Sequence, residues 1–212
     1  MINETQAQSL AALRERIRSY MSGKRLSHTY AVEREITVLS ALYAPEMEFT
    51  LRAAALLHDI TKELSLEKQL QLCDEFDIIY TQEEALTPKI FHSRTAAAVI
   101  RRDFSEYASD EILSAIRWHT TGHAAMTLGE QLLFLADYIE DTRTFESCVE
   151  LRRFFYNGIE KAGDAAARDE HLRDTMILSF DMTIRELLCD GKPIHVDTVE
   201  ARNYFVCRKR GA

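Results

Sequence analysis

Glycine and proline are scarce in this sequence, which has only 7 Gly and 3 Pro among 212 residues. Stretches of alternating β-branched residues, which would indicate half-buried strands, are absent as well. No internal repeat, low-complexity tract or linker interrupts the chain. These absences predict an all-α fold, and the length favours one domain because domains commonly hold roughly 100–200 residues.

Paired cysteines and long apolar runs are also missing. Cys73, Cys148, Cys189 and Cys207 form no CxxC pair, which argues against a zinc knuckle or a disulfide framework and predicts free, buried thiols. No apolar run approaches the roughly 18 residues needed to span a bilayer, and the polar N-terminus lacks the apolar region of a signal peptide. We therefore predict a cytoplasmic protein without a membrane partner.

A net positive charge is likewise absent. The formal net charge is -8 and the isoelectric point about 5.4, so no basic field exists to attract nucleic acid, and we expect no nucleic-acid partner. If the substrate carries phosphate, metal ions or a few well-placed Lys and Arg side chains must meet its charge locally. The composition therefore points toward a metal site.

Apolar residues recur at helical spacing along most of the chain. The pattern predicts a first helix over about residues 4–21 that ends at Gly23, then a short polar link, and a second helix that Ser27 caps. The segment from Phe76 to Pro88 loses this periodicity, so we expect a connecting loop there.

The first predicted helix carries an apolar face formed by Leu10, Leu13 and Ile17. Such a face can pack inside the molecule or against a second copy, and periodicity alone does not choose between them. A homodimer is therefore compatible with the sequence.

Several histidines lie on the apolar faces of predicted helices, where a single one is more often a core residue than a ligand. An adjacent His-Asp pair and an aspartate enclosed by apolar neighbours accompany them, and such a buried carboxylate is costly without a cation. Together they offer the N and O ligands that bind Fe, Mn or Zn. The set comprises His28, His58, Asp59, His92, His119 and Asp137.

The order of these residues resembles the signature of the HD-domain phosphohydrolases: a lone His, a His-Asp pair and a distant Asp. More narrowly, several stretches are similar to the bacterial symmetrical bis(5′-nucleosyl)-tetraphosphatase family. They are KRLSHT at 24–29, ALLHDITK at 55–62, AIRWHTTG at 115–122, FLADYIE at 134–140, GKPIH at 191–195 and TVEARN at 198–203. The resemblance covers most of the chain, although Glu140–Arg143 lacks the proline expected after LADYIE, so the loop that carries Arg143 could sit differently.

This resemblance implies a single HD domain over residues 1–212, with metal-binding helices over about residues 24–145 and a C-terminal helical layer over about residues 146–212. It implies hydrolysis of diadenosine tetraphosphate to two ADP, by attack of a metal-bound hydroxide, with iron in a binuclear site. The same ligands accept Mn, Zn or Ni. Another HD-type nucleotidase or phosphodiesterase, or a non-catalytic nucleotide-binding regulator, are the alternatives.

The expected roles follow from the resemblance and the chemistry of each side chain. Asp59 would bridge two metals and Lys62, one helical turn later, would steady developing charge, which makes these two the expected catalytic residues. Metal ligation is expected of His28, His58, Asp59, His92, His119 and Asp137, with phosphate contact as the alternative for His92 and His119. Substrate contacts are expected from Arg25, Asp59, Lys62, His92, His119, Thr120, Thr121 and Arg143. Structural or surface roles are expected for His123, His171, His195 and Trp118.

Overall fold

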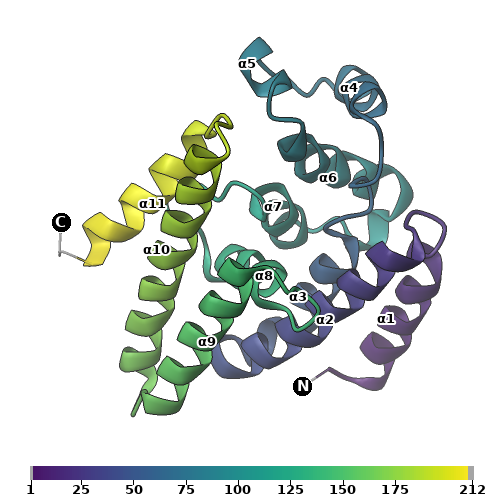
Figure 1. The fold of residues 1–212 in the computed structure, drawn as a ribbon. Helices are drawn as coiled ribbons and strands as arrows, with labels where there is room; N and C mark the ends of the chain where they lie inside the picture. The colour runs from purple at the N-terminus through teal and green to yellow at the C-terminus, as the bar shows by residue number, and fades with distance from the viewer. Residues whose placement is uncertain (1, 210–212) are drawn as a thin grey trace.

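The structure is a computed structural model that describes residues 2–209, and all regular secondary structure in that range is helical (Figure 1). The prediction of an all-α fold is confirmed. The helices are α1 (Glu4–Ile17), α2 (Gly23–Tyr43), α3 (Glu48–Leu57), α4 (Leu66–Glu75), α5 (Gln82–Ala85), α6 (Phe91–Asp103), α7 (Asp110–Trp118), α8 (Leu128–Ile139), α9 (Glu146–Lys161), α10 (Ala165–Cys189) and α11 (Val196–Lys209), with short 3-10 turns η1 (Pro45–Met47), η2 (Pro88–Ile90) and η3 (Ser105–Tyr107).

The boundary between the first two helices differs from the prediction. Ser22, not Ser27, caps α2, because its side chain accepts the backbone N–H of Arg25 and Ser27 lies inside the helix. The expected polar link is therefore the first turn of α2. This correction places Arg25 and His28 one turn apart on the same helix.

Helices α2, α3, α7 and α8 form the middle of the molecule (Figure 1). α2 packs against α3 and α8, while α7 packs against α3, α6 and α8. On the C-terminal side, α10 lies between α9 and α11 and reaches α8. One cluster of buried apolar side chains continues from Leu10 in α1 to Phe205 in α11.

The apolar face of α1 is internal. Leu10, Leu13 and Ile17 are fully buried within the chain's own core, which resolves the alternative that the sequence left open. An ion-pair network reinforces this packing, because Arg14 of α1 and Arg52 of α3 both contact the buried carboxylate of Glu33 in α2. A second copy cannot use this face without unfolding it.

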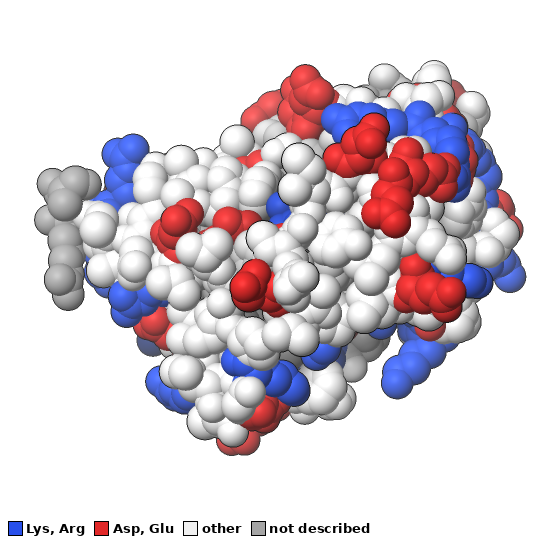
Figure 2. Space-filling model, turned by 90° about the horizontal axis from the view of Figure 1, so that it is seen from above, with Lys and Arg blue, Asp and Glu red and all other residues white. Residues whose placement is uncertain are grey.

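Three predictions drawn from the composition can be compared with the structure. All four cysteines are free, but only Cys73 and Cys148 are buried, whereas Cys189 and Cys207 are exposed. Among the described residues, no helix combines the length and apolar character needed to cross a membrane. Acidic and basic residues alternate on the face seen from above, where no broad basic area forms (Figure 2).

The segment expected to be a loop contains the short helix α5, which Glu84 links to other parts of the chain. Glu84 accepts a hydrogen bond from Arg94 of α6, and its Oε1 lies 2.9 Å from Nε2 of His195, just before α11. The Arg94 hydrogen bond is the main cause that lowers the pKa of Glu84 from its ordinary 4.5 to about 2. Glu84 thus connects α5 to α6 and to the C-terminal helices.

Glu84→Gln should make stability less dependent on acidic pH. Because the pKa of Glu84 is lower in the folded state, its contribution is complete above about pH 4.5 and is lost as pH falls toward about 2. The difference in Tm between wild type and variant should therefore be largest near neutrality and shrink toward about pH 2. Thermal unfolding followed by circular dichroism measures this, with the exposed neighbour Glu83→Gln as control. A difference that stays constant over that range would contradict the assignment.

Candidate metal centre

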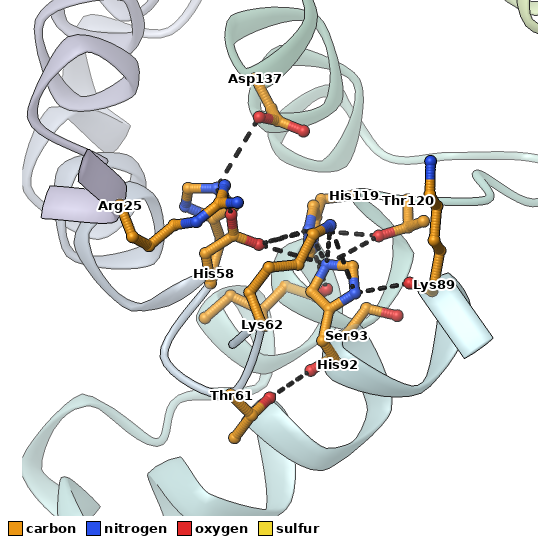
Figure 3. Close-up of polar contacts among 12 residues, drawn as sticks. Arg25, His58, Thr61, Lys62, Lys89, His92, Ser93, His119, Thr120 and Asp137 are labelled. Atoms are coloured by element: carbon orange, nitrogen blue, oxygen red, sulfur yellow. Dashed lines mark hydrogen bonds and ion pairs between the residues drawn. The ribbon is translucent and has the colours of Figure 1, made fainter. Parts of the chain in front are cut away.

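The histidines and aspartates singled out in the sequence converge from five helices on one point. Figure 3 shows His58, His92, His119 and Asp137 of this set. α2 carries His28 and α6 carries His92, while α8 carries Asp137. His58 and His119 stand at the C-terminal ends of α3 and α7. Asp59 follows His58 and is 2% exposed.

Backbone carbonyls orient three of the imidazoles. Nδ1 of His58, His92 and His119 each lies within 2.7 Å of the carbonyl oxygen three residues earlier in the chain. A carbonyl oxygen can only accept a hydrogen bond, so Nδ1 carries the proton and Nε2 is unprotonated. Each Nε2 then points to the common centre, which is the form of imidazole that binds metals.

His28 is oriented by a carboxylate that the sequence analysis did not assign. Its Nδ1 lies 3.1 Å from Oε1 of Glu140, which is fully buried. The backbone N–H and hydroxyl of Thr142 donate to the same carboxylate at 2.6 and 2.8 Å. The available signal was the position of Glu140 at the end of an apolar helix, three residues after Asp137.

Burial alone would lower the pKa of His28, but the carboxylates of Asp137 and Glu140 outweigh it and raise this pKa to about 9. A metal ion at Nε2 takes the place of the proton that these carboxylates stabilise. For His92 the opposite holds, since burial and the charge of Lys62 lower its pKa to about 3. His92 is therefore a neutral imidazole near neutral pH.

Asp59 stands between two pairs of histidines. Its Oδ2 lies 3.7 Å from Nε2 of His28 and 3.4 Å from Nε2 of His58. Its Oδ1 lies 3.2 Å from Nε2 of His92 and 3.7 Å from Nε2 of His119. The two carboxylate oxygens thus face different imidazoles.

Asp137 completes the first of these groups from the opposite side. Its Oδ1 lies 3.0 Å from Nε2 of His28 and 3.8 Å from Nε2 of His58. Burial would raise the pKa of Asp137, yet the charge of Arg143 and the neighbouring histidines hold it well below the usual range. Asp137 is therefore a carboxylate at neutral pH.

The donor set fits a metal ion. Two buried polar atoms at the centre have no hydrogen-bond partner: Nε2 of His58 and Oδ1 of Asp59. Moreover, Nε2 of His92 and Nε2 of His119 are 2.9 Å apart although neither carries a proton in this tautomer. Facing lone pairs repel, and a cation between them relieves that repulsion.

The potential ligand atoms form two groups, and within each group all the atoms lie within 4.8 Å of one another. They are His28, His58 and Asp137, and His58, Asp59 and His119. Both groups combine imidazole nitrogens with a carboxylate, which suits Fe, Mn, Zn or Ni. They share His58, whose single free lone pair can bind only one ion.

Three partly exposed cations surround the buried carboxylates. Arg25 Nη1 lies 2.7 Å from Oδ2 of Asp59, and Arg143 donates to Oδ1 of Asp137. Lys62 Nζ lies 3.8 Å from Oδ1 of Asp59, and burial lowers its pKa. Burial would also raise the pKa of Asp59, but its electrostatic interactions with His58 and Lys62 keep this pKa far below the usual range.

The two predicted threonines differ in position. The hydroxyl of Thr120 lies 3.2 Å from Nε2 of His92 and 3.2 Å from Nε2 of His119. Thr121 is buried, and its hydroxyl donates to the carbonyl of Gly122. The structure therefore brings Thr120 to the centre and directs Thr121 away from it.

The loop that carries Arg143 reaches the centre without the expected proline, as its contact with Asp137 shows. The remaining histidines contact other parts of the chain. His123 pairs with Glu130, His171 lies 2.9 Å from the carbonyl of Phe155, and His195 contacts Glu84. None of them belongs to the cluster.

Comparisons with known proteins agree with this geometry. The family model of the HD domain matches residues 25–142. A relative from Halalkalibacterium halodurans is 29% identical over 198 residues, which are 92% of this chain and 95% of that protein. One from Staphylococcus aureus is 31% identical over 136 residues, which are 63% of this chain and 68% of that protein. Both are named symmetrical bis(5′-nucleosyl)-tetraphosphatase.

A solved structure from Clostridium acetobutylicum has the same fold, with a TM-score of 0.80 and 28% sequence identity. The match covers 94% of this chain and 97% of that chain. It is described as a predicted HD superfamily hydrolase involved in NAD metabolism.

Glu140→Gln should weaken metal binding by roughly 10-fold to 100-fold, as is typical when the partner of a metal-binding histidine is changed. The amide keeps the volume of the buried side chain but removes the charge that orients His28. Competition with a chromophoric chelator measures the affinity. Asp141→Asn is the matched control, because Asp141 is exposed and pairs only with exposed Arg34. Equal affinities in all three proteins would show that Glu140 does not support the site.

Proposed function

Because the chain belongs to the HD domain family, we propose that it is a metal-dependent hydrolase that cleaves diadenosine tetraphosphate symmetrically into two ADP. Relatives that match most of its length carry the name of this activity. The observation that carries the proposal is the convergence of four imidazole Nε2 atoms on the carboxylates of Asp59 and Asp137. We further propose that residues 1–212 act as one HD domain.

The position of Asp59 supports a binuclear centre. One ion would be held by His28, His58 and Asp137 with Oδ2 of Asp59, and a second by His92 and His119 with Oδ1. In this arrangement His58 would bind one ion only, as its single free lone pair requires. Iron is the proposed metal, and the N/O ligand set equally admits Mn, Zn or Ni.

When bound, the metal ions supply Lewis acidity, which acidifies water toward neutrality and offsets the negative charge of phosphate. Hydrolysis adds water across the central P–O–P linkage, so that one ADP gains the hydroxyl group and the other a proton. The chain's own contribution is to bind and orient the phosphates. That role suits Arg25, Lys62 and Arg143, which stand at the rim of the centre and already contact carboxylate oxygens.

Product analysis tests the reaction. Metal-loaded protein is incubated with diadenosine tetraphosphate, with and without chelator, and the nucleotides are resolved by chromatography. We expect ADP as the sole product and no turnover with chelator. AMP plus ATP would contradict symmetrical cleavage, and tightly bound nucleotide without product would favour a non-catalytic regulator.

Substitutions at Asp59 and Lys62 should have different effects. Asp59→Ala should abolish both metal retention and turnover, because Asp59 faces every histidine of the cluster. Lys62→Ala should retain metal but lower kcat by roughly 100-fold, as for loss of one group that stabilises transition-state charge. Metal analysis and steady-state kinetics distinguish the two, with exposed Lys68→Ala as control. Normal turnover by Asp59→Ala would refute the mechanism.

A substrate panel separates this activity from its alternatives. The relative described as acting in NAD metabolism makes NAD, which also contains a P–O–P linkage, the first compound to compare. Mononucleotides and phosphodiesters test the broader HD-type activities. The homodimer, the absence of a nucleic-acid partner and the cytoplasmic location stay predictions.

A further inference from the structure

A second pocket lies between α6, α7 and the segment that follows α4, with a volume of about 600 Å³. Three arginines line it: Arg94 and Arg101 from α6 and Arg117 from α7. Phe76 and Trp118 are among its other lining residues. No residue of the metal centre lines this pocket.

The pocket and the metal centre occupy opposite faces of the same two helices. Residues two positions apart on an α-helix point about 200° apart. Arg94 therefore points away from His92, and Arg117 away from His119, as their different surroundings confirm. The two sites stand back to back across α6 and α7.

Two of the three arginines in the pocket are not paired with an anion. Within residues 2–209, Arg101 and Arg117 have no ion pair or hydrogen bond. Arg117 is partly buried, and its guanidinium lies 4.0 Å from the centre of the Trp118 ring. Arg94 pairs with Glu84, but its Nε is buried without a partner. A partly buried guanidinium without an anion, such as that of Arg117, favours binding of one.

The two acidic lining residues, Glu84 and Asp110, offset the charge of the three arginines only in part. Glu84 already contacts Arg94 and His195, and Asp110 is exposed in the first turn of α7. The remainder of the lining is largely apolar, with Ile78, Leu113 and the 91% exposed Ile79. In a protein of net charge -8 without a broad basic area on the face seen in Figure 2, this local group of arginines is an exception.

We propose that this pocket is a second nucleotide-binding site, which takes a nucleoside phosphate without help from the metal centre. The phosphates lie against Arg94, Arg101 and Arg117, which offer planar, multidentate donors to phosphate oxygens. The base lies against the apolar wall that includes Phe76, Ile78 and Leu113, since aromatic and apolar surfaces bind planar bases. A volume of about 600 Å³ falls in the usual range for small-molecule sites and suits a mononucleotide. This inference goes beyond the proposed hydrolase function and does not depend on it.

The protein's single tryptophan provides a direct readout, because Trp118 lines the pocket. We would titrate the full chain with ADP in the presence of chelator, follow tryptophan fluorescence and repeat the titration by calorimetry. We expect saturable binding in wild type and in His58→Ala, whose metal centre is disabled. Because ADP binding is measured without metal and without turnover, a failure of the hydrolase proposal does not affect this result.

Charge reversal in the pocket should weaken ADP binding at least tenfold, in Arg117→Glu and independently in Arg101→Glu. Arg101 is exposed and unpaired, so its substitution leaves the fold intact even if Arg117→Glu does not. Arg185→Glu, which changes an exposed arginine of α10, should bind ADP normally. Absence of binding by wild type with chelator, or undiminished binding by Arg101→Glu, would overturn the proposal. Inorganic pyrophosphate that binds as tightly as ADP would overturn the assignment to nucleotides.

Discussion

The architecture depends on two carboxylates where five helices meet: Asp59, which is buried, and Asp137, which is partly buried. Removing a carboxylate from water costs about several kcal/mol unless positive charge and hydrogen-bond donors compensate it. The imidazoles and the rim cations Arg25, Lys62 and Arg143 provide that compensation. Helices α2, α3, α6, α7 and α8 must therefore present their polar residues to one point while the rest of their buried faces remains apolar.

The same local structure satisfies the helix ends and orients the metal ligands. The last carbonyls of an α-helix lack donors within the helix, and an imidazole N–H can supply one. His58 and His119 do so at the ends of α3 and α7, which turns Nε2 of each ring toward the centre. His28 lacks such a carbonyl partner and depends on Glu140 instead. For His28, the buried carboxylate of Glu140 at the end of α8 thus takes the orienting role that a backbone carbonyl has for His58 and His119.

Helical periodicity explains how much of the site the sequence could predict. Few Gly and Pro residues indicated helices, and the apolar stripes placed His28, His58, His92 and His119 on inward faces. The apolar neighbours of Asp137 indicated a buried carboxylate that needs a cation. The order of these residues, rather than any one of them, indicated the family. All these inferences concern which face of its own helix a residue occupies, and spacing along the chain determines that.

Contacts between helices could not be predicted from the sequence. His28 and Glu140 are 112 positions apart, and no periodicity relates them. Spacing also does not show which oxygen of Asp59 faces which imidazole. It does not show that the hydroxyl of Thr121 donates to the carbonyl of Gly122 instead of facing the metal centre. The arginine pocket likewise forms only when α6 and α7 pack together. The sequence by itself determined the helices, their buried faces and the candidate ligands, whereas tertiary packing decided which atoms meet, because that depends on how the helices cross.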